Sequence, residues 1–254
     1  MSGTTTNIFD TQVLGGLSAS LLFTPSIAAV GHWFRDKRAN ATGLAITGGS
    51  VGGIVFPFVF QQLIPRIGFP WACRVAGFVQ LASLIPANLL IRSRLKPLPD
   101  AKATVDFTAF RSPVFSITTF ATFLTEWGIF IPITYLPIYA IDHGTSEGFS
   151  FILVSIFNVG SVFGRWLPSF AADIYGRYNM TILMSILSFT MVLGLWLPIE
   201  HMANAKAMLI ATALACGFCS GSGIGLIPVC IGQICRAEDY GKRYGTCYCL
   251  ASFA

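Results

Sequence analysis

The chain has 254 residues, of which 54% are hydrophobic and only 11% are charged, and its formal net charge is +5. Soluble domains carry about 25% charged residues, so this composition excludes an ordinary water-soluble fold and favours lipid as the solvent. In lipid, backbone groups are satisfied only within helices and closed barrels. The long unbroken apolar runs, in place of short alternating strands, predict an all-α membrane protein.

Seven apolar segments are long enough to cross a bilayer as helices, which takes about 20 residues each. An eighth apolar run begins at Tyr244 and has eleven residues, too few to cross at about 1.5 Å per residue, so we expect a partial helix there. The predicted spans are residues 11–33, 41–63, 71–92, 113–139, 149–173, 180–199 and 207–234.

The basic residues predict the orientation of these spans. Twelve of the sixteen Lys and Arg residues fall in loops on one side, three fall on the other side, and Arg165 lies inside a span. Loops rich in Lys and Arg stay in the cytoplasm, which places the first ten residues outside. Those residues lack a basic stretch and a cleavage pattern, so we expect no signal peptide. We expect a first unit at 1–92, a cytoplasmic central loop at 93–112 and a second unit at 113–254.

Glycines recur four residues apart in two of the spans. Gly48 and Gly52, and likewise Gly49 and Gly53, follow the first basic loop, and the seventh span repeats the spacing at 217, 221 and 225. Small residues at this spacing lie on one helix face and let a neighbouring backbone approach closely. The pattern indicates ordinary helix packing or, alternatively, contacts that slide as a cavity opens and closes.

Four short stretches of the chain are distinctive: WFRDKRANATGLAITGGSVGG (33–53), FPWACRVAGF (69–78), AADIYGRYN (171–179) and RAEDYGKRYGT (236–246). They resemble motifs of the major facilitator superfamily, in its monocarboxylate transporter-like branch, and they occur in the family's order. The stretch at 236–246 resembles fungal members in particular.

This resemblance implies that the spans are helices four to ten, with the start of helix eleven, of a twelve-helix bundle. The chain would then be a partial bundle, truncated at both ends. The implied function is transport of a small organic anion such as a monocarboxylate, with or without a proton, by alternating access. The implied location is the plasma membrane.

Arg165 is an ionisable residue inside a span, and such residues are by default candidates for function. It resembles the eighth-helix arginine that pairs with the substrate carboxylate in this branch. Asn158 and Ser161 lie seven and four residues earlier on the same helix face and are candidates for lining the same site. Alternatively, Arg165 snorkels or is held by backbone carbonyls. Ser161 stands where proton-coupled members carry an aspartate, which weakens the case for simple proton symport.

Glu126 is the second ionisable residue within a span. A glutamate buried in an apolar setting is able to hold a proton at neutral pH, which makes Glu126 the candidate for proton coupling. The alternative is a structural role, in which a protonated Glu126 forms a hydrogen bond with a neighbouring helix.

Two cytoplasmic loops form the candidate conformational site. Asp173, Gly176 and Arg177 resemble a loop motif of the superfamily, and in that family the loop ties helices together in one conformational state. The alternative is a solvated pair between Asp173 and Arg177. The basic loop contributes Arg35, Lys37 and Arg38.

No motif of a hydrolase, a zinc protease or a nucleotide-binding loop occurs, so we expect no enzyme activity. We also expect no cofactor, no metal and no nucleic-acid partner. The pair Cys216 and Cys219 indicates helix packing, with a metal or redox site as the alternative. Three interpretations stay open: an inactive fragment of a transporter, a chain that works only with a partner or as an oligomer, and a membrane receptor or regulator.

Overall fold

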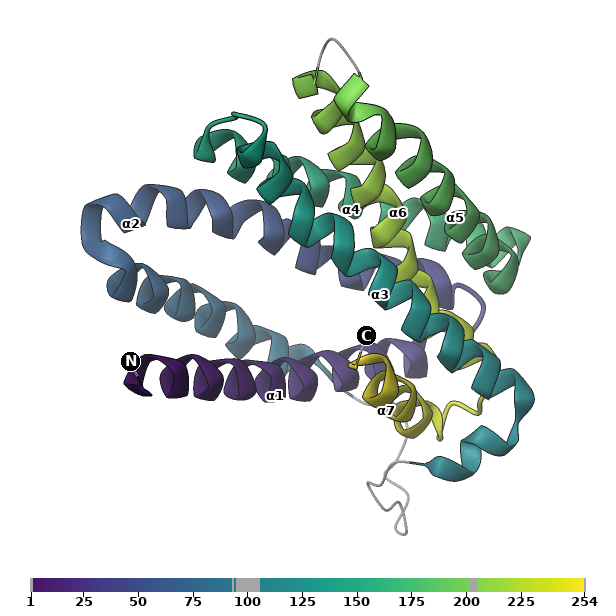
Figure 1. Cartoon of the computed structure of the whole chain (residues 1–254). Coiled ribbons are helices and arrows are strands. Elements are labelled where there is room, and N and C mark those ends of the chain that lie inside the picture. The colour runs from purple at the N-terminus through teal and green to yellow at the C-terminus, as the bar shows by residue number, and fades with distance from the viewer. Residues whose placement is uncertain (1, 93, 95–105, 202–204, 254) are drawn as a thin grey trace.

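The computed structural model describes residues 2–92, 94, 106–201 and 205–253, and the regular elements within them are all helical (Figure 1). The short elements are the 3-10 helices η1 (Phe107–Arg111) and η3 (Leu197–His201) and the π-helical turn η2 (Val192–Trp196). The long elements are α1 (Ser2–Trp33), α2 (Arg38–Leu90), α3 (Pro113–Asp142), α4 (Glu147–Tyr175), α5 (Arg177–Met191), α6 (Ala205–Gln233) and α7 (Tyr240–Ala251).

The predicted spans correspond to these helices. Six helices of the described chain are long and apolar enough to cross a membrane, and α2 contains two of the predicted spans. The all-α membrane fold is therefore confirmed. The partial helix expected from Tyr244 begins earlier, at Tyr240, as α7. Most of the predicted central loop, at 93 and 95–105, lies outside the described residues.

A bend at Gly68 divides α2 into two arms, residues 38–67 and 69–90. Gly68 has φ +78° and ψ 162°, a conformation that breaks the helix, and Figure 1 shows the chain folding back there. Side chains with a Cβ rarely adopt a positive φ, whereas glycine does so freely. Pro65 and Pro70 flank the bend. One glycine thus produces the turn of the hairpin that joins the spans predicted at residues 41–63 and 71–92.

Gly68→Ala is expected to lower the free energy of unfolding by about 1 kcal/mol, because alanine is strained at this φ although the space around it is open. Gly77→Ala is the matched control, since Gly77 is helical and has nothing within 4 Å of an added Cβ, while at Gly68 the nearest atom, Cδ of Pro70, is at an ordinary contact distance of 3.8 Å. Thermal unfolding of both variants in the same detergent measures the difference. Equal midpoints would show that the bend tolerates a Cβ.

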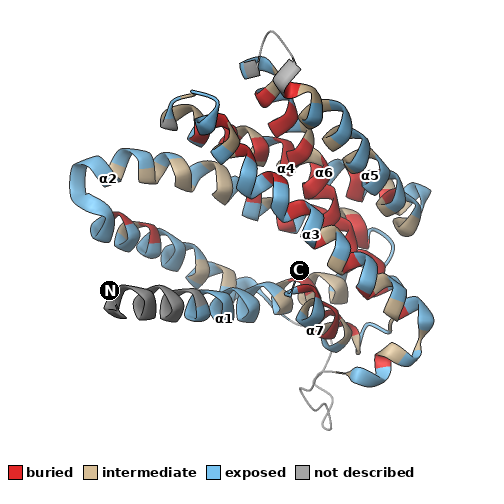
Figure 2. Cartoon of the chain, viewed as in Figure 1, coloured by how far each residue is buried: buried red, intermediate tan, exposed pale blue. Residues whose placement is uncertain are grey.

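The core lies around α6. In the most apolar 18-residue segment of each helix, 72% of the residues are buried in α6 and 6% in α1. Figure 2 shows the buried residues concentrated on α6 and the helices next to it. Glycines bring α4 and α6 into backbone contact: a Cβ on Gly160 or Gly164 of α4 would collide with the α6 backbone, and a Cβ on Gly217 would collide with the carbonyl of Phe157. The predicted packing role of the seventh-span glycines is confirmed.

The first arm of α2 packs on α4 through a second set of glycines. A Cβ on Gly43 would collide with the backbone of Arg165, and a Cβ on Gly53 would collide with the amide group of Asn158. Gly49 faces the guanidinium of Arg165. Gly48, in contrast, faces open space. Of the two predicted glycine pairs, only Gly49 and Gly53 therefore lie at the contact between α2 and α4.

Candidate functional site

Arg165 projects from α4 into the contact with the first arm of α2. Its Nη1 donates a hydrogen bond to the carbonyl oxygen of Ile46, with 2.6 Å between the two atoms. Its Nε is buried and has no hydrogen-bond partner among the described residues. Gly49 makes room for the group, since an added Cβ would lie 2.8 Å from Nη1. The guanidinium is thus held by a backbone carbonyl and still has donors to offer.

Ser161 and Asn158 lie on the same side of α4 and also face α2. The buried Ser161 hydroxyl accepts a hydrogen bond from Ser50, with 3.0 Å between the oxygens. The Asn158 side chain donates to the carbonyl of Val154 on its own helix at 2.9 Å. The structure therefore brings the three residues of the predicted anion site together at the contact between α2 and α4.

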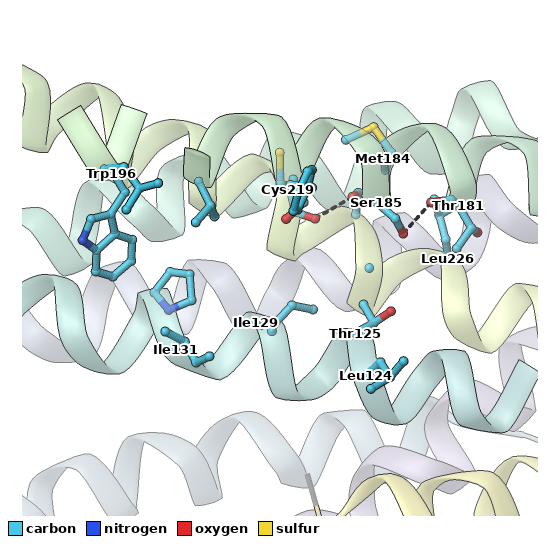
Figure 3. Close-up of a pocket in the computed structure, with 18 residues that line it drawn as sticks. Leu124, Thr125, Ile129, Ile131, Thr181, Met184, Ser185, Trp196, Cys219 and Leu226 are labelled. Carbon is cyan, nitrogen blue, oxygen red and sulfur yellow. Dashed lines mark hydrogen bonds between the residues drawn. The ribbon is translucent and has the colours of Figure 1, made fainter. Parts of the chain in front are cut away.

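The described part of the chain contains a cavity of about 550 Å³ elsewhere, between α3, α5 and α6. Figure 3 shows Ile129, Trp196 and Leu226 among its lining residues. The hydroxyls of Thr125 and Ser185 in its wall donate to carbonyls of their own helices. No charged side chain is among the described residues that line the cavity, and no sequence motif predicted it.

Glu126 is buried in α3, with 8% of its surface exposed. Its Oε1 accepts a hydrogen bond from the hydroxyl of Tyr248 on α7, with 3.2 Å between the oxygens. Among the described residues, no hydrogen bond or ion pair joins Glu126 to Arg165. The geometry of a glutamate bonded to a neighbouring helix is thus present, and the two candidate functional groups lie in separate contacts.

Asp173, near the end of α4, caps the beginning of α2. Its Oδ1 accepts from the backbone N–H of Ala39 at 3.1 Å, and its Oδ2 accepts from that of Asn40 at 2.9 Å. Lys37 is the residue before the helix and makes no side-chain cap. A carboxylate at a helix N-terminus satisfies free N–H groups and interacts favourably with the helix dipole.

The remaining residues of the predicted conformational loop complete this contact. Gly176, with φ +97°, ends α4 and lets α5 begin at once with Arg177. Nη2 of Arg177 lies 4.0 Å from Oδ1 of Asp173 and donates to the carbonyl of Arg35 at 3.3 Å. The two loops that sequence reasoning singled out are therefore in direct contact.

Arg38 makes a second connection at the same end of the molecule. Its buried guanidinium donates to the carbonyl of Gly232, at the end of α6, over 3.1 Å, and its Cζ lies 4.1 Å from the centre of the Tyr240 ring. Gly31 and Gly232 crowd the guanidinium so closely that neither could carry a Cβ without displacing it. Arg38 thus joins α1, α2, α6 and α7.

A third connection was not predicted. Asp106, just before η1, forms an ion pair with Lys242 at 3.3 Å, and its backbone N–H donates to the hydroxyl of Thr246 at 2.9 Å. The hydrogen bond from the Thr108 hydroxyl, together with Lys242, holds the pKa of Asp106 below its ordinary value. Because the partners are far apart in the sequence, no local pattern indicated this contact.

Asp173→Ala is expected to lower the free energy of unfolding by about 1–2 kcal/mol, because two N–H groups at the start of α2 lose their acceptor. The control is Asp36→Ala, which removes an exposed acidic residue from the adjoining loop. Thermal unfolding in one detergent compares them. Equal losses from both variants would mean that the cap contributes nothing.

Comparison with known proteins places the chain in a family. A sequence model described as Major Facilitator Superfamily matches residues 8–254. The MFS-type transporter opdF of Penicillium oxalicum is 40% identical over 95% of this chain and 56% of its own length. The aspyridones efflux protein apdF of Emericella nidulans is 36% identical over 95% and 49%, and the riboflavin transporter MCH5 of Saccharomyces cerevisiae is 32% identical over 97% and 51%.

The chain spans about half the length of these curated relatives. The family match nevertheless extends over almost all of its residues, and the apolar helices are those of a multi-pass integral membrane protein. This chain belongs to the major facilitator superfamily.

Proposed function

We propose that the chain forms part of a transporter that moves a small organic anion across the membrane by alternating access, with Arg165 as the anion-binding residue. The observation that carries the proposal is the guanidinium at the contact between the two units, with a buried Nε that lacks a partner among the described residues. A guanidinium presents a planar fork of donors that matches a carboxylate. The substrate class is thus an organic acid, and monocarboxylates are its simplest members.

Ser161 and Asn158 extend this site along α4. The hydroxyls of Ser50 and Ser161 and the side-chain amide of Asn158, which lies against Gly53, offer polar groups to a substrate that enters between α2 and α4. The names of the relatives, which include a riboflavin transporter and an aspyridones efflux protein, favour larger organic molecules and outward movement as the second candidate. Both candidates use the same contact between the units.

The cytoplasmic contacts support an alternating-access cycle. Asp173, Arg177 and Arg38 join the cytoplasmic ends of the two units, so a substrate at Arg165 reaches the cytoplasm only after these contacts separate. Glu126 is the group proposed to take up and release a proton during the cycle. The plasma membrane is the proposed location.

Gly49→Ala tests the proposed site against a matched neighbour. A Cβ at Gly49 displaces the Arg165 guanidinium, whereas Gly48 has nothing within 4 Å. Uptake of radiolabelled lactate is measured in proteoliposomes that contain the complete protein encoded by the native transcript. We expect Gly49→Ala to reduce uptake about tenfold, because a lost hydrogen bond to a charged group is worth about 1.5 kcal/mol. Gly48→Ala is expected to leave uptake unchanged. Equal uptake by the two variants would contradict the assignment. The same measurement with radiolabelled riboflavin tests the larger substrates.

A further inference from the structure

Three tyrosines form a continuous row of tilted ring contacts along one face of α7. Tyr240, Tyr244 and Tyr248 are four residues apart, which places them on the same side of the helix. Their ring centroids are 5.7 Å apart for the first pair and 4.6 Å apart for the second. Tyr240 and Tyr244 are each only 1% exposed. We call these three residues the tyrosine ladder.

Each end of the tyrosine ladder contacts an ionisable group in another helix. At one end the Tyr248 hydroxyl donates to the carboxyl group of Glu126 in α3. At the other end the guanidinium of Arg38 lies over the Tyr240 ring. The Tyr240 hydroxyl also donates to the carbonyl of Pro228 in α6, with 3.0 Å between the oxygens. The ladder therefore connects a buried carboxyl group to the cytoplasmic end of the molecule.

The Arg38 junction, formed by Arg38, Gly31, Gly232 and Tyr240, depends on the position of the Tyr240 ring. Arg38 is 6% exposed and forms no ion pair among the described residues. Its positive charge is compensated by one carbonyl and by the face of the ring. A buried charge with so few partners is sensitive to the loss of any one of them. A small movement of Tyr240 would thus weaken the junction.

We propose that the tyrosine ladder couples Glu126 to the Arg38 junction, with Tyr248 as the positioning residue that responds to the state of the carboxyl group. A charged carboxylate accepts a stronger hydrogen bond from the Tyr248 hydroxyl than a neutral carboxyl group does. The titratable groups that face Glu126 are Tyr244, Cys247 and Tyr248, all on α7. Protonation of Glu126 therefore loosens α7 from α3, and the ladder carries the movement to the cytoplasmic contact.

This inference rests on the proposed function, in which Glu126 holds the proton, but its test needs no transport. Hydrogen exchange of the protein in lipid nanodiscs, followed by mass spectrometry, reports on the backbone at residues 31–45 and 232–245. Tyr248→Phe keeps the ring and removes the hydrogen bond to Glu126. We expect exchange about tenfold faster in both segments, the factor for one hydrogen bond to a charged group. Glu126→Gln, which removes the charge but keeps an acceptor, is expected to accelerate the same segments by less than Tyr248→Phe does, because a neutral amide oxygen accepts a weaker hydrogen bond than a carboxylate.

Tyr178→Phe is the matched control. The Tyr178 hydroxyl, on α5, donates to the carbonyl of Cys230 at 3.4 Å and lies 3.2 Å from the hydroxyl of Thr118, so this variant removes the hydrogen bonds of a tyrosine that is not part of the ladder. We expect it to leave both segments within about twofold of the wild-type rate. Wild-type exchange in Tyr248→Phe or in Glu126→Gln, or equal acceleration in Tyr178→Phe, would overturn the proposal.

The middle of the ladder supplies a second test. Tyr244→Leu interrupts the row of rings and leaves the hydrogen bonds of Glu126 and Arg38 in place, whereas Tyr244→Phe preserves the rings. Coupling through the ladder predicts that Tyr248→Phe has no further effect on residues 31–45 in the Tyr244→Leu background and its full effect in the Tyr244→Phe background. The same effect in both would overturn the coupling and leave the proposed transport function untouched. A failure of lactate uptake, in turn, would not alter these exchange rates.

Discussion

Gly217→Ala is expected to lower the free energy of unfolding by about 3 kcal/mol, at the upper end of the cost of overpacking a core. A Cβ at Gly217 would run into the carbonyl of Phe157, and α4 would have to move away from α6 to admit it. Because a backbone cannot yield by changing a rotamer, the displacement spreads along the whole contact. Thermal unfolding of the purified protein in detergent measures the loss.

Gly128→Ala provides the control for this prediction. Gly128 lies within α3 and has nothing within 4 Å of the position that a Cβ would take. Its replacement tests the general effect of an extra methyl group in a membrane helix, which is expected to be close to zero. If Gly217→Ala unfolded at the same temperature as Gly128→Ala, the close contact of α4 with α6 would not be a source of stability.

Arg165→Ala is expected to reduce transport of the organic anion by about 100-fold, because it removes a forked, charged hydrogen-bond donor worth about 3 kcal/mol. The loss should appear in uptake, with unchanged amounts of protein in the membrane. The only hydrogen bond within the described residues that this variant loses from the Arg165 side chain is the one to the carbonyl of Ile46, so we expect the protein to remain folded.

Arg165→Lys separates charge from geometry. Lysine keeps the positive charge but cannot present two parallel donors to a carboxylate, so we expect an intermediate loss of about tenfold. Uptake of radiolabelled lactate in proteoliposomes that contain equal amounts of each variant gives the order wild type, lysine, alanine. Full activity in the alanine variant would show that Arg165 has a structural role only.

Much of this architecture was predictable because lipid imposes simple rules on the sequence. The length of each apolar run predicted the spans, and the motif at Asp173 predicted a loop that ties helices together, whereas its contact with the start of α2 is seen only in the structure. The spacing of Gly49 and Gly53 indicated a helix contact, and the structure identifies α4 as the partner. Roles that depend on the length and periodicity of a segment could therefore be predicted from sequence.

The contacts between distant segments were not predictable. Gly160 and Gly164 have the same spacing as the glycines that were noticed, but only the folded chain shows that they face α6. Asp106 and Lys242 form an ion pair although more than 130 residues separate them in the sequence, and no periodicity relates them. The tyrosine ladder has a clear helical spacing, yet its meaning depends on Glu126 and Arg38 at its two ends.

The measurement that tests the central claim most directly is equilibrium binding of a radiolabelled organic anion to the purified protein in lipid nanodiscs. The protein used is the complete chain encoded by the native transcript. Lactate and riboflavin are the first two probes, and Arg165→Ala is compared with the wild type at equal protein concentration. The account predicts saturable binding of an anion to the wild type and its loss in Arg165→Ala. Saturable binding of the same affinity in Arg165→Ala would contradict the assignment of Arg165 as the anion-binding residue.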